Sequence, residues 1–170
     1  MANSAKNAWS VTVKSTHWLV ALTVIVNLFN ETGETHRLIG YACVCLVLIR
    51  ILHGILPNAP QSSKFYWPSL ARIQRHMVEV QQQKFSHEGG HNPLGQWAVY
   101  GMWLLIFLLT ATGWLSRTDA FWGEDWPVDW HVLASNGLIV MVVVHIFAVV
   151  LMSFLMKRNL IKKMLLDCKK

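Results

Sequence analysis

Four histidines of this chain stand within or beside long apolar segments, where an ionisable side chain finds little water. His145 follows three valines, and His17 lies inside the first apolar segment of the chain. His36 and His131 each open a further apolar segment. Ionisable groups inside a membrane are costly and usually functional, and neutral imidazole is a common metal ligand. For His36 alone, an interfacial position near a helix end is the better explanation, so the assignment depends on the spacing of all four residues.

That spacing predicts two sites at different depths of a membrane. His131 and His145 are 14 residues apart, which in a helix places them within about 40° of one face and about 21 Å apart along the axis. His17 lies early in the first segment, at the depth of His145. His36 opens the second segment, which runs the opposite way, and so lies at the depth of His131.

Imidazoles from two facing helices form a natural pair of axial ligands for haem iron. We therefore predict two haems b, one held by His17 and His145 and the other by His36 and His131. A C-x-x-C-H motif for covalent haem attachment does not occur in the chain, so we expect ligation and packing alone to hold the haems.

The elements that position these residues are four segments long enough to cross a bilayer. Of the 170 residues, 54% are hydrophobic and only 14% are charged, and nine are tryptophan, which concentrates at bilayer interfaces. A hydrocarbon core of about 30 Å needs about 20 mostly apolar helical residues. The sequence predicts an all-α integral membrane protein, a single four-helix bundle over residues 1–170 with haems between its helices. Its predicted spans are 11–29, 36–56, 93–115 and 130–156.

The segments between the spans indicate how the helices connect. The first span is too long for the apolar part of a cleavable signal, so we expect it to remain in the protein. Two connections are short, 30–35 and 116–129, and one is longer, 57–92. Within the longer one, four apolar residues between Leu70 and Val80 are spaced to share a helix face, which predicts a surface helix over 68–85. The three cysteines indicate no disulfide framework.

Basic residues gather on one side of the predicted membrane. The side with the N-terminus, residues 57–92 and the C-terminal tail carries 13 basic and three acidic residues, a net charge of +10. The other side carries two basic and six acidic residues, a net charge of −4. Because Lys and Arg accumulate in cytoplasmic loops, both termini are predicted to be cytoplasmic. The charged residues of the outer side are Glu31, Glu34, Arg37, Arg117, Asp119, Glu124, Asp125 and Asp129.

Arg50 and the remaining histidines have weaker assignments. Arg50 is 14 residues after His36 and shares its face, at the depth of the inner haem. A buried arginine needs an anion, either a haem propionate, which we favour, or a lipid phosphate reached by snorkelling. His53 lies off that face and is not assigned to a haem. His91 either shapes a quinone pocket or belongs to the cap of the third helix.

Several motifs together resemble a known family. Thr-His17-Trp opens the first helix, His-Arg-Leu-Ile-Gly40 opens the second and Arg50-Ile-Leu-His-Gly closes it. The loop ending Gly-His-Asn-Pro-Leu-Gly95, the pair Trp-His131 and the His145 helix follow the same pattern. Over nearly its whole length the chain resembles the bacterial four-helix di-haem cytochromes b, which include prokaryotic cytochrome b561 and the cytochrome b subunits of nickel–iron hydrogenases. His53 departs from the pattern, since many relatives are expected to carry an aromatic residue there.

The resemblance implies an electron conduit in the bacterial inner membrane. Electrons would pass between ubiquinone or menaquinone and a periplasmic redox partner, such as a c-type cytochrome or an oxidoreductase subunit. The alternative is a free-standing enzyme that oxidises superoxide and reduces quinone. The acidic outer side favours the first reading, because it attracts a basic protein and repels the superoxide anion. A haem-free scaffold would leave four histidines in paired register unexplained, and we expect no nucleic-acid partner.

Overall fold

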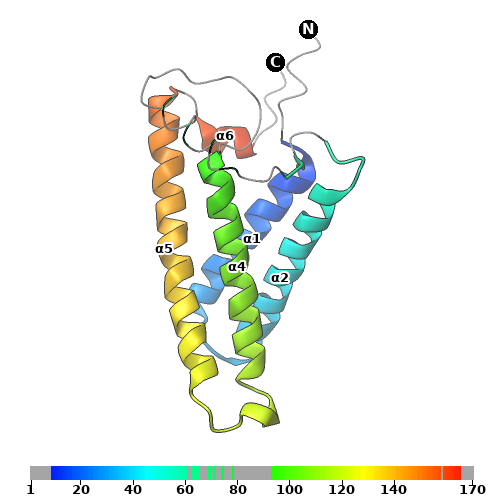
Figure 1. Ribbon diagram of the computed structural model, residues 1–170, viewed down its shortest axis with the longest axis vertical. Helices are drawn as coiled ribbons and strands as arrows, with labels where there is room; N and C mark the ends of the chain where they lie inside the picture. The colour runs from blue at the N-terminus through cyan, green and yellow to red at the C-terminus, as the bar shows by residue number, and fades with distance from the viewer. Residues whose placement is uncertain are drawn as a thin grey trace.

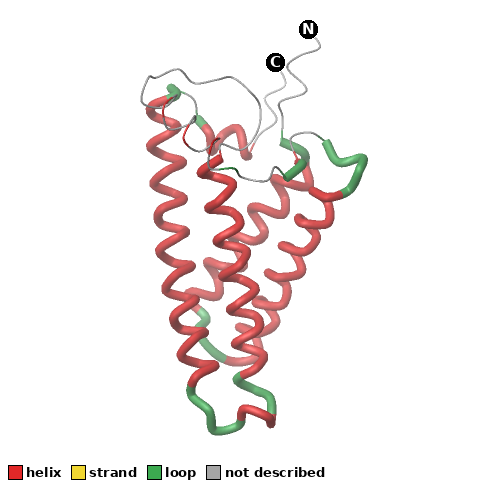
Figure 2. Tube along the Cα trace, in the orientation of Figure 1, coloured by secondary structure: helices red, strands yellow, loops and turns green. Residues whose placement is uncertain are grey.

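In the part of the chain that the computed structural model describes, the regular secondary structure is helical, and loops and turns connect the helices (Figure 2). The described residues are 9–60, 63–65, 93–157 and 159–165, with Ser69, Ala71, Gln74 and Val78 as isolated positions. Four long helices occur in this part: α1 (Val11–Phe29), α2 (Gly33–Ile55), α4 (Pro93–Leu115) and α5 (Trp126–Leu155). A short 3-10 turn, η3 (Asp119–Phe121), and a short helix, α6 (Leu160–Leu165), complete it.

Each long helix is long enough and apolar enough to cross a membrane. The spanning segments are 19, 23, 21 and 30 residues long, within the described residues. At 1.5 Å per residue the longest, α5, measures about 45 Å and extends past a hydrocarbon core of about 30 Å. The predicted fold class, a four-helix integral membrane bundle, is therefore confirmed.

The helices run up and down, with sequence neighbours packed together (Figure 1). α1 packs on α2 and α4 packs on α5, and α2 also contacts α4. We call the end where α1 begins and α5 finishes the terminal end, and the end with the two short connections the connection end. At the terminal end α6 packs on α5, and the Trp18 indole N–H donates to the Met164 carbonyl at 3.3 Å.

Two helices begin earlier than the apolar pattern predicts. α2 begins at Gly33 rather than His36, and Gly33 has φ +96°, a conformation that favours glycine. α5 begins at Trp126 rather than Trp130, with Pro127 in its first turn, where a missing N–H costs no hydrogen bond. The added first turn of α2 is polar, and that of α5 carries Pro127 and Asp129, so both turns lie outside the apolar segments that defined the predicted spans. The predicted surface helix 68–85 and the histidines His76, His87 and His91 lie outside the described residues, apart from the four isolated positions.

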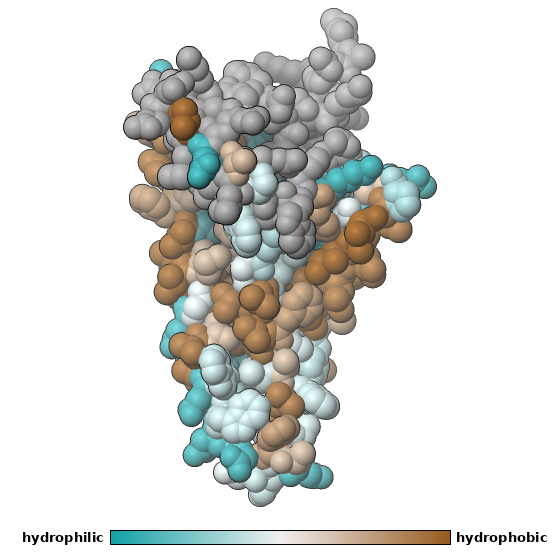
Figure 3. Space-filling model, viewed as in Figure 1, coloured by the Kyte–Doolittle hydropathy of each residue, from teal (hydrophilic) through white to brown (hydrophobic). Residues whose placement is uncertain are grey.

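Apolar side chains cover the outside of the bundle as well as its inside. Large hydrophobic residues of all four long helices are exposed, and in Figure 3 they form a broad band over the middle of the molecule. Hydrophilic side chains gather at the connection end in that view. So large an exposed apolar surface would be unfavourable on a monomer in water, whereas it is favourable in contact with lipid. The chain is a multi-pass membrane protein.

Candidate functional site

His17 of α1 and His145 of α5 lie side by side in the terminal half of the bundle. Their ring centroids are 6.2 Å apart and the ring planes meet at 56°. Both rings are partly buried, and Trp18 packs edge-on against His17 with centroids 5.4 Å apart. Helices far apart in the sequence thus bring these two imidazoles together, in agreement with the equal depth predicted for His17 and His145.

His36 of α2 and His131 of α5 form a second pair near the connection end. Their ring centroids are 6.1 Å apart and the planes meet at 63°. The two pairs therefore have almost the same separation. Since His131 and His145 both belong to α5, the two pairs lie about 21 Å apart along that helix.

Hydrogen bonds orient both rings of this second pair. The Nδ1 atom of His36 lies 2.6 Å from the Asn30 carbonyl oxygen, which can only accept, so Nδ1 carries the proton. The Nδ1 atom of His131 lies 3.1 Å from the Thr112 hydroxyl oxygen. That hydroxyl donates its own hydrogen to the Leu108 carbonyl at 2.7 Å, so its oxygen accepts from His131. In both rings Nε2 is left with a free lone pair, the form that binds a metal.

A glycine makes room for one of these rings. A Cβ atom at Gly113 would lie 3.1 Å from Cε1 and 3.3 Å from Nδ1 of His131. These separations are tighter than ordinary contact, so a side chain here would push the imidazole away from α4. Among the helical glycines Gly40, Gly101, Gly113 and Gly137, Gly113 is the one that lies against a candidate ligand.

A cavity of about 320 Å³ opens beside His36 and His131. Its walls come from α1, α2, α4 and α5, and they are mostly apolar side chains with some hydroxyl and amide groups. Three charged residues also border it: Glu31, Arg37 and Arg117. A pocket between bundle helices with a few convergent polar groups is the usual setting for a bound cofactor.

An apolar layer separates the two histidine pairs. Cys43, Val47, Ile106 and Leu138 form a buried cluster, and Val47 is fully buried. Leu138 stands midway between His131 and His145 in α5. Cys43, Ile106 and Leu138 also line the cavity beside His36 and His131, so the cluster bounds that cavity on the side of the other histidine pair.

Arg50 is buried at the terminal end, with only 7% of its surface exposed. One guanidinium nitrogen, Nη2, donates to the Ser63 carbonyl at 3.2 Å, and the group lies over the Phe65 ring at 4.5 Å. Its other terminal nitrogen, Nη1, has no hydrogen-bond partner among the described residues. A buried charged donor without a partner is costly, and an anion beside Nη1 would offset that cost.

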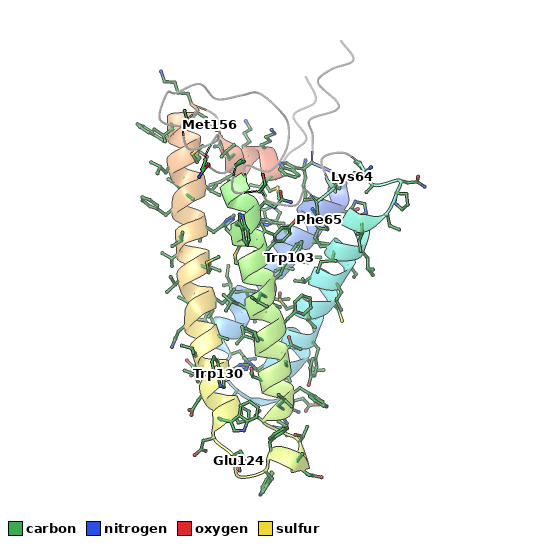
Figure 4. All side chains as sticks on the ribbon, in the orientation of Figure 1. Lys64, Phe65, Trp103, Glu124, Trp130 and Met156 are labelled. Carbon is green, nitrogen blue, oxygen red and sulfur yellow. The ribbon has the colours of Figure 1, made fainter. Side chains whose placement is uncertain are left out.

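The segment around Ser63 and Phe65 covers this arginine. Phe65 and Trp103 lie near each other (Figure 4) and pack edge to face, with ring centroids 5.4 Å apart. A Cβ at Gly54 would overlap the Phe65 ring, so only glycine at position 54 leaves room for that ring. Ser63 donates to the Ser10 hydroxyl at 2.9 Å, and Ser10 also lies 3.4 Å from His53 Nε2. His53 therefore belongs to this polar cluster and to neither histidine pair.

Each pair supplies two nitrogen ligands and no more. In the described part of the chain, no group of three His, Cys, Asp or Glu side chains comes together. A bare zinc ion in a protein site usually takes three or four protein ligands. Haem iron needs only two, because the porphyrin occupies its other four positions. The donor set therefore fits haem.

Sequence reasoning did not find the groups that orient the ligands. Asn30 and Thr112 lie on segments whose polar residues have no distinguishing spacing, and their roles depend on which ring each faces. A threonine that precedes a glycine on the neighbouring helix is too common a pattern to single out Thr112.

The comparisons with known proteins agree with the site. A search of curated proteins and a search of solved structures found no match. A model of the family described as prokaryotic cytochrome b561 matches residues 8–166, nearly the whole chain. With four membrane-spanning helices as well, the chain belongs to the prokaryotic cytochrome b561 family, whose members are membrane proteins that bind haem b and transfer electrons.

Proposed function

We propose that this protein carries electrons across the inner membrane through two haems b, between the quinone pool and a periplasmic redox partner. His17 and His145 would hold one haem, and His36 and His131 the other. The observation that carries the proposal is that the two histidine pairs have almost the same distance between their ring centroids. Bound haem b would supply a one-electron carrier at each position.

Ring spacing supports two axial ligand pairs. An imidazole nitrogen binds a metal at about 2.0 Å, and the ring centre lies about 1.15 Å behind it in a five-membered ring of ordinary bonds. Two rings on opposite sides of one metal would thus have centres about 6.3 Å apart. The observed values are 6.2 Å and 6.1 Å.

The chain's own residues would perform three tasks in such a conduit. The four imidazoles would hold the iron atoms, and the hydrogen bonds to Asn30 and Thr112 would direct Nε2 of His36 and His131 to the metal. The apolar layer around Val47 would lie between the two haems. Arg50 offers its free Nη1 to a haem propionate of the inner site, which would neutralise that buried charge.

Charge supports the orientation and the class of partner. The net charge of +10 on the terminal side places that side in the cytoplasm by the positive-inside rule. The connection end would then face the periplasm with its net charge of −4. An acidic face favours a basic partner, such as a c-type cytochrome, and it disfavours the rival activity of a superoxide:quinone oxidoreductase.

The purified protein is expected to carry about two non-covalent haems per chain, both six-coordinate and low-spin, because each iron would have two imidazoles. Acid-acetone extraction followed by a pyridine haemochrome assay measures the number and the attachment. A value near one, or haem that remains on the polypeptide, would contradict the two-pair arrangement.

Thr112→Val is expected to lower the affinity for the outer haem, the one proposed at His36 and His131, by about tenfold. Groups that hydrogen-bond to ligating histidines contribute about 10- to 100-fold in affinity. Valine keeps the shape and removes only the acceptor for His131. Thr118→Val is the matched control, since the Thr118 hydroxyl donates to the Leu115 carbonyl at 2.8 Å and the residue does not line the cavity. Haem retention during gel filtration measures both variants. Equal loss in the two would show that the Thr112 hydroxyl has no special role.

A further inference from the structure

Two arginines border the cavity beside His36 and His131. Arg37 follows His36 in α2, and Arg117 lies two residues beyond the end of α4. Both side chains line the same cavity of about 320 Å³. Arg37 is partly buried and Arg117 is exposed, and both residues lie at the connection end of the bundle.

The cavity differs in charge from the surface around it. The connection end as a whole has a net charge of −4, with Glu124 at its tip (Figure 4). The cavity lining, by contrast, contains both arginines and a single carboxylate, that of Glu31. Within the described residues, neither arginine side chain forms a hydrogen bond or an ion pair. The two cations of this end are thus gathered at one cavity and left available to an anionic ligand.

We propose that Arg37 and Arg117 bind the two propionate carboxylates of the haem held by His36 and His131. The inference rests on the proposed function, since it needs a haem at that pair. A haem edge carries two carboxylates, and six acidic residues on the same side would repel them. Two guanidinium groups at the cavity mouth offset that repulsion, and each matches a carboxylate with two parallel N–H donors.

This pairing has two measurable consequences for the outer haem. Loss of either arginine would weaken binding by about tenfold, a value between those of an exposed ion pair and of a buried charged hydrogen bond. It would also lower the reduction potential, because a nearby positive charge stabilises the state that has gained an electron. Arg37→Lys and Arg117→Lys keep the charge and would recover most of the potential but only part of the affinity.

The experiment uses the full chain with His17→Ala, which should retain the outer haem alone. Into it we place Arg37→Gln, Arg117→Gln, both together, or Lys162→Gln, which removes an exposed cation at the opposite end of the bundle. Each apoprotein is loaded with protohaem IX or with its dimethyl ester, in which both carboxylates are neutral. The rate of haem loss to excess apomyoglobin and a redox titration are then compared between variants for each haem.

With protohaem, we expect each Arg→Gln change to speed haem loss about tenfold, the double change to act more strongly, and Lys162→Gln to have no effect. With the dimethyl ester, the same Arg→Gln changes should alter the rate less than about twofold, because there is no carboxylate left to lose. Equal effects with both haems, or none with either, would overturn the inference while leaving the histidine pairs intact. If the His17→Ala chain binds no haem or two haems, the proposed function fails, and the inference fails with it.

Discussion

Replacement of His145 or His17 by alanine is expected to remove one haem and to leave the other in place. The two proposed sites share helix α5 but no ligand, so removal of one imidazole should empty a single site. The pyridine haemochrome value should fall from about two to about one haem per chain. Redox titration should show that the same component disappears in both variants, since both residues belong to the pair with ring centroids 6.2 Å apart.

His36→Ala and His131→Ala should remove the opposite component. Their rings are 6.1 Å apart near the connection end, about 21 Å along α5 from the first pair. His53→Ala is the matched control, because this partly buried histidine contacts Ser10 and belongs to neither pair. The pairing would be wrong if His17→Ala and His36→Ala removed the same redox component, or if His53→Ala removed either one.

Reduction or oxidation of the haems by a basic soluble cytochrome should be fast at low salt and much slower as salt rises. The connection end carries the net charge of −4 that would steer such a partner. Steering of this kind raises association rates by about 10- to 1000-fold, and it fades as the Debye length shrinks from about 30 Å at 0.01 M salt to about 8 Å at 0.15 M. Stopped-flow spectroscopy across a salt series measures the effect.

Charge variants make the same test specific to one face. Asp119→Asn with Glu124→Gln neutralises two exposed carboxylates of the connection end, and should slow the reaction at low salt while leaving the high-salt rate unchanged. Lys162→Gln, at the other end of the bundle, should change neither rate. Superoxide, as an anion, should show the opposite salt trend. Rapid superoxide turnover coupled to quinone reduction, without a response to any basic protein, would favour the enzyme over the conduit.

The sequence by itself determined the membrane fold and the depth of each candidate ligand. Four apolar segments of membrane length predicted α1, α2, α4 and α5, and the structure confirms them with shifted starts at Gly33 and Trp126. Depth follows from residue number, because every helical residue adds about 1.5 Å along the axis. The different depths of His131 and His145 therefore follow from their residue numbers, without any knowledge of contacts between helices. Their role as iron ligands remains a prediction.

Only the tertiary structure shows how each helix is rotated about its axis and which neighbour it faces. The depth of a residue does not contain this information. Only packing shows that Thr112 and Gly113 meet His131, or that Arg37 and Arg117 border one cavity. A rise of about 1.5 Å per residue specifies height, whereas the facing of two helices depends on side chains that interlock across the interface. Membrane helices are apolar on every side, so their sequence pattern carries little information about which face turns inward.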